Sequence, residues 1–398
     1  MNSLRHIVEE SPLLRAIETD TSQSSHDEET AQPLGAARWD WNEVQRILLV
    51  RLRSIGDTVL ATPSAAALKR FVPNARIDVL VEDWVAPLLD QHPLIDQVLQ
   101  VPRRGISSRT RIARELRRRR YDVAYNLHGG TTATFLTRAS GARHRVGYKT
   151  YQYAQLHNHQ APSPLELWGQ QKTHSVEQQL ALLGWTGVPV TDRPRTVLGV
   201  SREASANIEQ RLKNSQLSGP IALIHPAAAF ATKQWKTENF AEVVDYLSGK
   251  GFNCVAVVAP SEREILQELT NKTKSVLITY DDLKLPEITA LAARSKLFVG
   301  NDSGIAHIAA AVGAPAVVIF GSSNIAHWRP WNHAPAEIVY EELPCQPCHG
   351  YFCEKFPVPE CILRVPVNQV EAAIDRVINS SNLEPRRMQS DGPIERST

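Results

Sequence analysis

The feature that most constrains the fold is an alternation of short, almost continuously apolar runs with amphipathic stretches, which occurs in two series along the chain. The apolar runs predict strands at 46–51, 76–81 and 122–127, and then at 221–225, 254–258, 297–299 and 316–320. The stretches between them predict helices at about 58–71, 173–183, 238–249, 261–270, 286–294 and 304–312. Such strands alternate with helices in parallel sheets that are covered on both faces.

The two series are separated by the proline-containing segment 187–220, which predicts two Rossmann-like domains facing a central cleft. The chain between the last strand of the first series and Pro164 is turn-rich and polar. The expected boundaries are a disordered acidic tail at 1–43, an N-terminal domain at 44–186, a linker region at 187–219, a C-terminal domain at 220–365, a C-terminal helix at 366–380 and a disordered tail at 381–398. In such folds ligands bind at the carboxyl ends of the strands, so the loops there are the candidate sites.

Composition excludes several classes of protein. No apolar run reaches the roughly 18 residues that a membrane-spanning helix needs, and Met1–Asp40 lacks the apolar core of a secretory signal. Five cysteines in 398 residues do not make a disulfide framework, which favours a reducing cytoplasm. Residues 1–40 carry a net charge of −5 and the remainder +7, so the folded part is mildly basic and compatible with an anionic partner.

The first candidate loop is Arg51-Leu-Arg-Ser-Ile-Gly-Asp57. Its single glycine does not make the G-x-G-x-x-G fingerprint, which argues against a dinucleotide oxidoreductase. Asp57 lies beside a predicted helix start, where a carboxylate is commonly an N-cap. The alternative is that Asp57 projects into the cleft as a general base. Arg51 and Arg53 either bind an anionic substrate there or are simply solvated.

Two further loops follow strands of the second series. In His225–Trp235 small residues permit close backbone approach to a ligand and Lys233 supplies a positive charge, whereas Trp235 is expected to pack. In Val299–Ala311 a tight turn precedes a small-residue helix, whose first N–H groups and dipole form an anion site. Taken alone, Asp302 is interpreted as an N-cap and His307 as a core histidine. Three such loops at equivalent strand ends together favour a ligand site.

With these loops and Phe320–Pro330, the chain from about residue 44 to 380 resembles glycosyltransferase family 9, the ADP-heptose:lipopolysaccharide heptosyltransferases. The Asp302-Ser-Gly-x-x-His307 block and Gly56-Asp57 are its most specific motifs. The resemblance implies an α/β protein of the two-domain GT-B fold, with the acceptor held by the N-terminal domain and the nucleotide sugar by the C-terminal domain. It implies an inverting transfer without a metal or other cofactor. The chain departs from relatives at Ala227–Ala229, where Gly, Ser or Thr is frequent, and this leaves the donor open.

By that resemblance Asp57 matches the catalytic base and Lys233 matches a lysine near the donor phosphates. The donor-binding residues would be Ala227, Ala228, Ser261, Glu262, Asp302, Ser303, Gly304 and His307. The acceptor-binding residues would be Arg51, Arg53, Ser54, Gly56 and His128. This set suits the chemistry, because an inverting transfer needs one base for the acceptor and charge neutralisation for the departing diphosphate.

Nine arginines and a single acid, Glu115, lie between Arg103 and Arg120. One interpretation is a solvated helix face, since arginine is a good helix former. The other is contact with phosphates, either of a phosphorylated glycolipid acceptor or of an anionic membrane leaflet. Nucleic acid is disfavoured, because no aromatic platform or recognition motif accompanies the run.

Four cysteines form the pattern Cys345-x2-Cys348-x4-Cys353-x7-Cys361. This spacing is compatible with a tetrahedral zinc or an iron–sulfur cluster. A similar cluster occurs in relatives that the chain resembles, where transfer does not need it, and this favours a structural loop of thiols without a metal.

Together with this resemblance, the sequence predicts a cytoplasmic glycosyltransferase, peripheral on the inner face of the inner membrane, that moves a heptose from ADP-heptose to a lipopolysaccharide inner-core acceptor. A family member with another nucleotide sugar or acceptor is one alternative, which the alanines at 227–229 keep open. A nucleotide-binding module without catalysis is another, and it would not need the carboxylate of Asp57.

Overall fold

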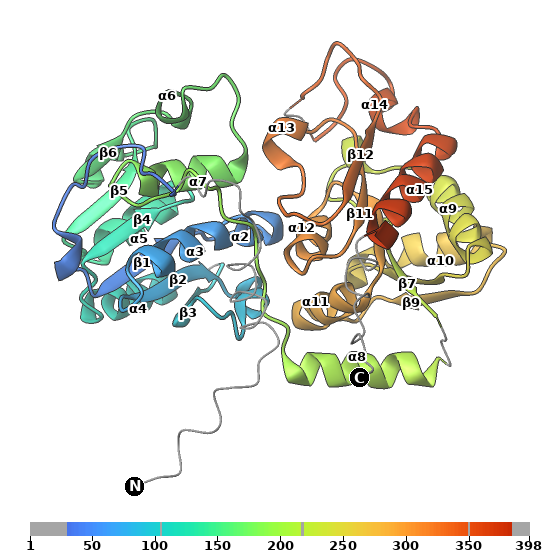
Figure 1. Ribbon diagram of the computed structural model, residues 1–398, viewed down its shortest axis with the longest axis horizontal. Helices are drawn as coiled ribbons and strands as arrows, with labels where there is room; N and C mark the ends of the chain where they lie inside the picture. The colour runs from blue at the N-terminus through green and yellow to red at the C-terminus, as the bar shows by residue number, and fades with distance from the viewer. Residues whose placement is uncertain (1–29, 104–105, 216–218, 349–350, 384–398) are drawn as a thin grey trace, which may run out of the picture.

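The structure is a computed structural model that describes residues 30–103, 106–215, 219–348 and 351–383. It contains two six-stranded parallel sheets, each covered by helices, which lie side by side as two domains (Figure 1). The sheet of the N-terminal domain has the order β3-β2-β1-β4-β5-β6. Its strands are β1 (Arg46–Val50), β2 (Arg76–Glu82), β3 (Gln97–Val101), β4 (Val123–Asn126), β5 (His144–Tyr148) and β6 (His159–Ala161). The paired strands are parallel throughout.

The sheet of the C-terminal domain has the order β12-β11-β10-β7-β8-β9, which is the same topology read from the opposite edge. Its strands are β7 (Ile221–His225), β8 (Asn253–Val257), β9 (Leu277–Tyr280), β10 (Leu297–Asn301), β11 (Ala316–Phe320) and β12 (Ala336–Tyr340). In each sheet the order reverses next to a central strand, β1 or β7, and ligands of such folds bind at that switch point.

The expected two Rossmann-like domains of the GT-B fold are therefore confirmed. All seven predicted strands exist, within one or two residues of their expected ends, and they are the central, almost fully buried ones. The sequence missed β3, β5, β6, β9 and β12. The polar stretch before Pro164 in fact holds helix α5 (Thr131–Ala139) and strands β5 and β6. These strands lie at or near sheet edges and expose part of their residues, so they lack the continuous apolar run that marks a buried strand.

The helices of the N-terminal domain are α2 (Ile55–Val59), α3 (Thr62–Phe71), α4 (Ile106–Arg118), α5 (Thr131–Ala139), α6 (Pro164–Trp168) and α7 (Ser175–Gly184). Those of the linker and the C-terminal domain are α8 (Arg202–Asn214), α9 (Thr237–Gly249), α10 (Arg263–Lys272), α11 (Leu285–Arg294), α12 (Gly304–Ala311), α13 (Ile325–Trp328), α14 (Glu360–Leu363) and α15 (Val367–Leu383). The single helix expected at 58–71 is two helices, because α3 restarts with Pro63 in its first turn, and proline favours that position.

The expected disordered tail at 1–43 extends too far. Residues 1–29 lie outside the described residues, but residues 30–43 pack against the N-terminal domain. The backbone N–H of Leu34 donates to the Gly184 carbonyl at 3.0 Å, and the buried Trp41 indole donates to the Thr186 carbonyl at 3.0 Å. The segment is acidic overall, so its composition did not indicate that Leu34 and Trp41 hold it against the domain.

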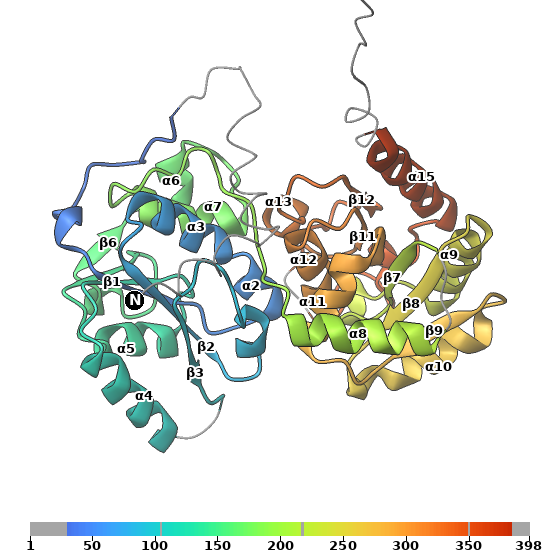
Figure 2. The same cartoon turned by 60° about the horizontal axis from the view of Figure 1, so that its bottom comes forward.

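The linker region also holds more structure than its composition indicated. It contains α8, which packs on α11 and runs across the C-terminal domain (Figure 2). The C-terminal helix expected at 366–380 corresponds to α15, which continues to Leu383, and residues 384–398 lie outside the described residues.

The two domains meet where α2 packs on α12, and two glycines allow the contact. A Cβ on Gly56 would approach His307 Cδ2 to 2.6 Å, and a Cβ on Gly304 would approach Ile55 Cβ to 2.7 Å. Both distances are too short for real side chains, so each helix presents backbone to the other domain. The loops after β1 and β10 are thereby brought face to face.

Candidate active site

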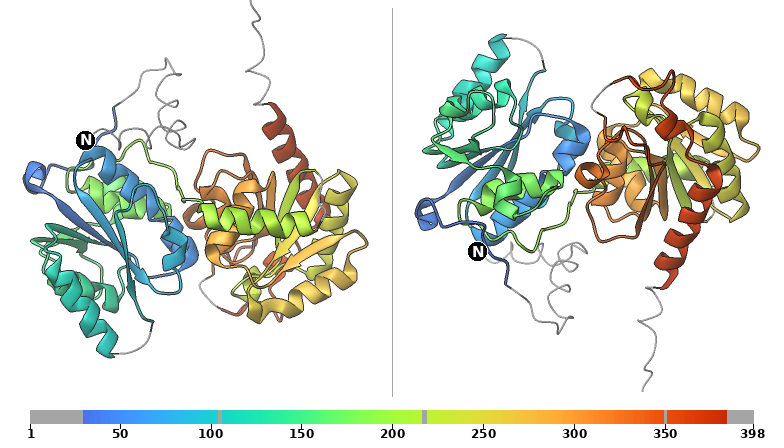
Figure 3. Two further views of the ribbon diagram at one scale, coloured as in Figure 1. Left: turned by 90° about the horizontal axis from the view of Figure 1, so that it is seen from below. Right: turned by 90° about the horizontal axis from the view of Figure 1, so that it is seen from above.

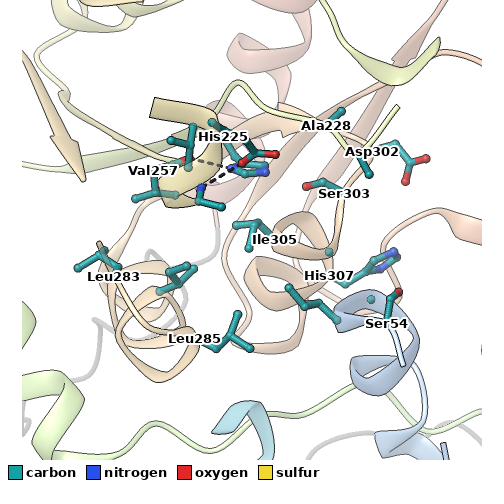
Figure 4. Close-up of a pocket in the computed structure, with 18 of the residues that line it drawn as sticks. Ser54, His225, Ala228, Val257, Leu283, Leu285, Asp302, Ser303, Ile305 and His307 are labelled. Atoms are coloured by element: carbon teal, nitrogen blue, oxygen red, sulfur yellow. Dashed lines mark hydrogen bonds between the residues drawn. The ribbon is translucent and has the colours of Figure 1, made fainter. Parts of the chain in front are cut away.

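A cavity of about 770 Å³ lies between the domains, at the carboxyl ends of β1, β7, β8 and β10. In Figure 4 Ser54 of the N-terminal domain lies next to His307 of the C-terminal domain, on the same side of the view as Ser303 and Asp302, whereas Val257, Leu283 and Leu285 lie on the other side. The three loops singled out in the sequence therefore converge on one space.

Asp57 enters this cavity from the third position of the short helix α2. The backbone N–H and the hydroxyl of Ser54 both donate to Asp57 Oδ2 at 3.0 Å, and Arg51 forms an ion pair with Oδ1. Burial raises the pKa of Asp57, but the Arg51 charge and the Ser54 hydrogen bonds outweigh it and hold the pKa below the ordinary value. Asp57 is thus an ionised carboxylate in a largely buried setting. The N-cap is Ser54 and not Asp57, because Asp57 bonds back to the helix start.

A second carboxylate–cation pair faces Asp57 from the C-terminal domain. Lys233, at the end of the 3-10 helix Ala231–Lys233, donates to Asp302 Oδ2 at 2.8 Å. The Ser323 hydroxyl donates to the same oxygen. Asp302 is buried, and it is not the N-cap of α12, because Ser303 has that position. The role of Asp302 in this structure is to tether the lysine at the cavity wall.

The start of α12 presents polar groups that lack partners. Among the described residues, the Ser303 hydroxyl and Nδ1 of His307 are buried side-chain atoms without a hydrogen bond. Both residues line the cavity beside Gly304. Burial lowers the pKa of His307, which leaves its imidazole neutral at pH 7. Orphaned polar atoms at a helix N-terminus suit an anionic ligand, since the first N–H groups and the helix dipole attract it.

One end of the cavity is apolar, and sequence reasoning did not find it. Val257, Val258, Leu283, Leu285 and Ile288 line it. The His225 imidazole bonds to the Val257 carbonyl at 2.8 Å, which fixes the loop after β7 against the loop after β8. These residues come from two loops and the start of a helix, and none of them belongs to a sequence motif. Only the folded structure shows that they line one apolar end of the cavity, which we call the apolar slot. The position of Val258 at the end of β8 was the available signal.

Ten of the fifteen predicted site residues line this cavity: Ser54, Gly56, Asp57, Ala228, Lys233, Glu262, Asp302, Ser303, Gly304 and His307. The structure does not bring three others to its wall. Ala227 is fully buried beneath its loop, Ser261 faces solvent, and Arg53 is exposed beside the loop after β1. The resemblance implied a ligand contact for each of the three, but side chains of neighbouring residues in a loop point in different directions.

The remaining two, Arg51 and His128, line a second cavity of about 140 Å³, which reaches the Arg51–Asp57 pair through Arg51. Tyr151, Gln178 and Gln179 also contribute to its wall. Three of its polar atoms are buried and lack a partner within the described part of the chain: Arg51 Nε, His128 Nδ1 and Gln179 Oε1. Burial, and next the Arg51 charge, lower the pKa of His128 to about 4, so that it is neutral at pH 7. The second cavity is therefore a polar space with several hydrogen-bonding groups that lack partners, which suits a hydroxyl-rich ligand.

The arginine-rich run forms α4 on the outer side of the N-terminal sheet. Arg119, just after the helix, is neutralised by Asp78 at 3.2 Å and Glu115 at 2.7 Å. Most of the other described arginines of the run are exposed. The run therefore combines one structural ion-pair network with a solvated basic face.

The four clustered cysteines are free thiols, with Cys361 buried and the other three partly exposed. Burial raises the pKa of the Cys361 thiol to about 11. Within the ranges that the structure describes, no group of three or more His, Cys, Asp or Glu side chains is arranged to hold a metal ion. None of the described helices is both long and apolar enough to cross a membrane.

Comparison with known proteins gives concordant results. Residues 109–357 match the family described as glycosyltransferase family 9 (heptosyltransferase). Lipopolysaccharide heptosyltransferase 3 of Escherichia coli is 27% identical over 352 residues, which cover 83% of this chain and 98% of that protein. A family 9 glycosyl transferase from Veillonella parvula has a similar structure, with a TM-score of 0.75, 20% identity and coverage of 84% and 98%. The E. coli ADP-heptose lps heptosyltransferase II has a TM-score of 0.71, 22% identity and coverage of 85% and 100%.

Proposed function

The chain belongs to glycosyltransferase family 9, and from this premise we propose that it transfers a heptose from ADP-heptose to a lipopolysaccharide inner-core acceptor with inversion at the anomeric carbon. The names of its relatives support the donor and the pathway, since they are lipopolysaccharide heptosyltransferases and one of them is named for ADP-heptose. The two-domain fold with a cavity between the domains is suited to enclosing two substrates.

Asp57 acts as the general base in this proposal. Its ionised carboxylate takes the proton of the acceptor hydroxyl while that oxygen bonds to the anomeric carbon of the sugar. The bond from that carbon to the diphosphate oxygen breaks on the opposite face, and ADP leaves with the electron pair. Arg51 and Ser54 hold the carboxylate in place and keep its pKa low, so it is ready to accept a proton at pH 7.

The C-terminal domain stabilises the negative charge that develops on the departing diphosphate. Lys233, aimed by Asp302, supplies a full positive charge, and the first N–H groups of α12 supply further donors beside Ser303. Because these groups neutralise the diphosphate, the transfer does not require a divalent metal. The apolar end of the cavity at Val257 and Leu285 receives the nucleobase of the donor. Ala228 and Ala229 carry no hydroxyl group, so they offer the sugar of the donor fewer hydrogen bonds than Ser or Thr would.

The second cavity receives the acceptor. Its wall includes Arg51, the ion-pair partner of Asp57, so in this proposal an acceptor ring bound there presents its hydroxyl to the base. Its neutral imidazole, amide and phenol groups suit the hydroxyls of a sugar ring. The phosphates of a phosphorylated glycolipid acceptor then remain outside the second cavity. In this proposal the enzyme works at the cytoplasmic face of the inner membrane.

The observation that carries the proposal is that Asp57 of the N-terminal domain and Lys233 of the C-terminal domain line one interdomain cavity. The test begins with isothermal calorimetry against ADP, UDP, GDP and NAD, with and without Mg²⁺. We expect selective binding of ADP that does not depend on Mg²⁺. A transfer assay with ADP-heptose and a truncated lipopolysaccharide acceptor in EDTA follows, with the anomeric configuration of the product determined by NMR.

The outcomes separate the alternatives. Preference for UDP or GDP would retain the transfer chemistry and replace the donor. ADP binding without transfer to any acceptor would favour a nucleotide-binding module, and loss of transfer in EDTA would contradict the metal-independent mechanism. Retention of the anomeric configuration would contradict the role of Asp57 as a base.

A further inference from the structure

The second cavity has one wall that comes from the C-terminal domain. Figures 1 and 2 both show α13 on the side of that domain that faces α7. His327 and Trp328 of α13 line the second cavity, whereas its other lining residues, among them Arg51 and His128, belong to the N-terminal domain. The site next to the proposed base is therefore built by both domains.

Hydrogen bonds hold α13 at both of its ends. Before the helix, the Ser323 hydroxyl donates to the carboxylate of Asp302. After the helix, the Arg329 carbonyl accepts a hydrogen bond from Nε2 of His174 at 2.8 Å. Nδ1 of His174 accepts from the Val176 N–H at 3.1 Å, so the ring hydrogen is on Nε2, as a bond to a carbonyl requires. The helix thus connects the loop after β10 with the start of α7 in the other domain.

The hydrogen bonds of His327 determine which of its ring nitrogens can bind a ligand. Nδ1 lies 3.1 Å from the Thr173 carbonyl, which can only accept, so Nδ1 carries the hydrogen. The Gln178 amide, 3.5 Å from the same nitrogen, donates to the Thr173 hydroxyl at 3.3 Å. Burial lowers the pKa of His327, which leaves the ring neutral at pH 7. Nε2 therefore keeps a lone pair that can accept a hydrogen bond from a hydroxyl.

A second neutral imidazole lines the same cavity from the N-terminal domain. His128 has a buried Nδ1 without a partner among the described residues. After burial, the Arg51 charge lowers and the Asp57 charge raises the pKa of both His128 and His327, so both rings lie near this ion pair. Two hydrogen-bonding rings from opposite domains, next to one carboxylate, are suited to orient a sugar ring for reaction.

Trp328 is a wall residue of both cavities. Of the described residues, only Trp328 lines the second cavity and also the larger interdomain cavity. Its side chain is half-buried, and its ring packs edge-on against that of His327 with centroids 4.4 Å apart. The indole is therefore a surface that a donor sugar in one cavity and an acceptor sugar in the other would share.

We propose that α13 completes the binding site of the acceptor sugar: Nε2 of His327 accepts a hydrogen bond from a hydroxyl of that sugar, and Trp328 separates it from the donor sugar. The inference rests on the proposed function, because it needs a hydroxyl-rich acceptor ring in the second cavity. It assigns recognition of the acceptor to both domains, whereas the family resemblance implies the N-terminal domain.

This assignment makes binding of ADP and of the acceptor depend on each other. Domains within one chain move relative to each other by default, and a ligand between them favours the closed arrangement. Only in that arrangement does α13 reach the second cavity. ADP should therefore tighten binding of the acceptor, and by linkage the acceptor should tighten binding of ADP by the same factor.

The first experiment removes Nε2 of His327 and keeps the bond to Thr173. In His327→Asn the amide nitrogen takes the place of Nδ1 and can donate to the Thr173 carbonyl, but no atom replaces Nε2. The KM of a deacylated, truncated lipopolysaccharide acceptor should rise by about tenfold, while the Kd of ADP in calorimetry changes by less than about twofold. His327→Gln places an amide oxygen near the position of Nε2 and should limit the rise in KM to about threefold.

A matched control and a second position accompany this variant. His333→Asn changes an exposed histidine that lines a separate cavity beside the linker, and it should leave the acceptor KM unchanged. Trp328→Leu should raise the acceptor KM and lower kcat by about tenfold each, because both substrates lose a wall. Trp328→Phe should restore most of both values.

The second experiment measures the coupling between the two ligands. The deacylated acceptor is titrated into the full chain by calorimetry, with and without saturating ADP. In the wild type ADP should lower the Kd of the acceptor by about fivefold or more, and in His327→Asn this factor should fall below about twofold. His128→Asn should weaken binding of the acceptor equally with and without ADP, because His128 belongs to the same domain as most of the cavity.

The outcomes distinguish this inference from the proposed function. An unchanged acceptor KM in both His327→Asn and Trp328→Leu, or an equal loss in His333→Asn, would overturn the role of α13 while the transfer assay still stood. A loss of affinity in His327→Asn that is the same with and without ADP, or no binding of the acceptor to the wild type with ADP present, would also overturn it. ADP-dependent binding that is lost in His327→Asn, without transfer by the wild type, would support the role of α13 and contradict the proposed transfer.

Discussion

Each of the two domains places a carboxylate–cation ion pair at the cavity, but the two pairs differ in which partner is accessible. Each places a carboxylate paired with a cation after a central strand, Asp57 with Arg51 in the N-terminal domain and Asp302 with Lys233 in the C-terminal domain. In the first pair the arginine is anchored by the Leu127 carbonyl at 2.5 Å, and the carboxylate faces the cavity. In the second pair the carboxylate is the more buried partner, and the lysine is the more accessible one.

This difference teaches that the topology does not determine which partner of an ion pair reaches the substrate. The arginine is permanently charged and serves as a fixed support, so the N-terminal pair offers a base. The buried Asp302 serves as the support in the C-terminal pair, which offers an ammonium group for a diphosphate. The predictions below test this division of roles.

The largest expected effect follows removal of the carboxylate in the N-terminal pair. Asp57→Asn keeps the shape and the Ser54 contacts but cannot take a proton, so kcat should fall by about 10³-fold while ADP affinity changes by less than about twofold. Steady-state kinetics and calorimetry measure the two quantities. Asp83→Asn is the control, because Asp83 follows the neighbouring strand β2 without lining the cavity, and loss of ADP binding together with kcat in Asp57→Asn would make Asp57 a structural residue.

Removal of the cation from the C-terminal pair should have the next largest effect. Lys233→Ala should lower kcat/KM by about 10²-fold and weaken ADP binding, because the developing charge on the diphosphate loses its ammonium partner. Lys236→Ala removes the same group from an exposed position three residues on and should leave both values unchanged. Equal behaviour of the two variants would remove Lys233 from the site.

Separation of the two pairs should also impair transfer. Gly304→Ala adds a methyl group that meets Ile55 at 2.7 Å, so α2 and α12 must move apart. Since small misplacements of reacting groups are costly, we expect kcat to fall by about tenfold or more with ADP affinity less affected. Gly249→Ala, where a Cβ meets no atom within 4 Å, is the control. Wild-type kcat in Gly304→Ala would contradict a closed interdomain site.

The next prediction concerns binding of the acceptor in the second cavity, next to the Arg51–Asp57 pair. His128→Leu removes a half-buried imidazole whose buried Nδ1 lacks a partner, and the acceptor KM should rise by about tenfold through loss of hydrogen bonding while ADP affinity is unchanged. His333→Leu, in a separate cavity beside the linker, is the matched control. A change in ADP affinity rather than acceptor KM would assign His128 to the donor side.

The smallest expected effect is a change in the pH dependence of kcat/KM, and it tests the role of Arg51. In the folded protein the Asp57 pKa is depressed, so its ion pair stabilises the fold above the ordinary aspartate pKa and this contribution is lost as the pH falls through the folded value. In Arg51→Gln burial is no longer offset by the Arg51 charge, and the pKa should rise. The acidic limb of kcat/KM should therefore move to higher pH by about one unit. An unmoved limb would show that another group titrates.

Much of this protein follows from the sequence alone, because the decisive signals are local. Nearly continuous apolar runs identified the central strands, and the turn at Asn301–Gly304 identified a helix start suited to anions. Residues at strand ends converge wherever parallel strands share an edge, so Asp57, Lys233 and Asp302 could be assigned to one site before their contacts were known.

Only the tertiary structure decided features that depend on segments distant along the chain. The pairing of Arg51 with Asp57, the apolar slot and the second cavity all require side-chain directions that no spacing encodes. The edge strands depend on neighbours for their hydrogen bonds, which explains why their own residues carry no clear signal. The packing of α2 on α12 likewise joins residues 55–59 to residues 304–311, and only the folding of two separate sheets brings these helices into contact. Figure 3 shows the two domains side by side from below and from above.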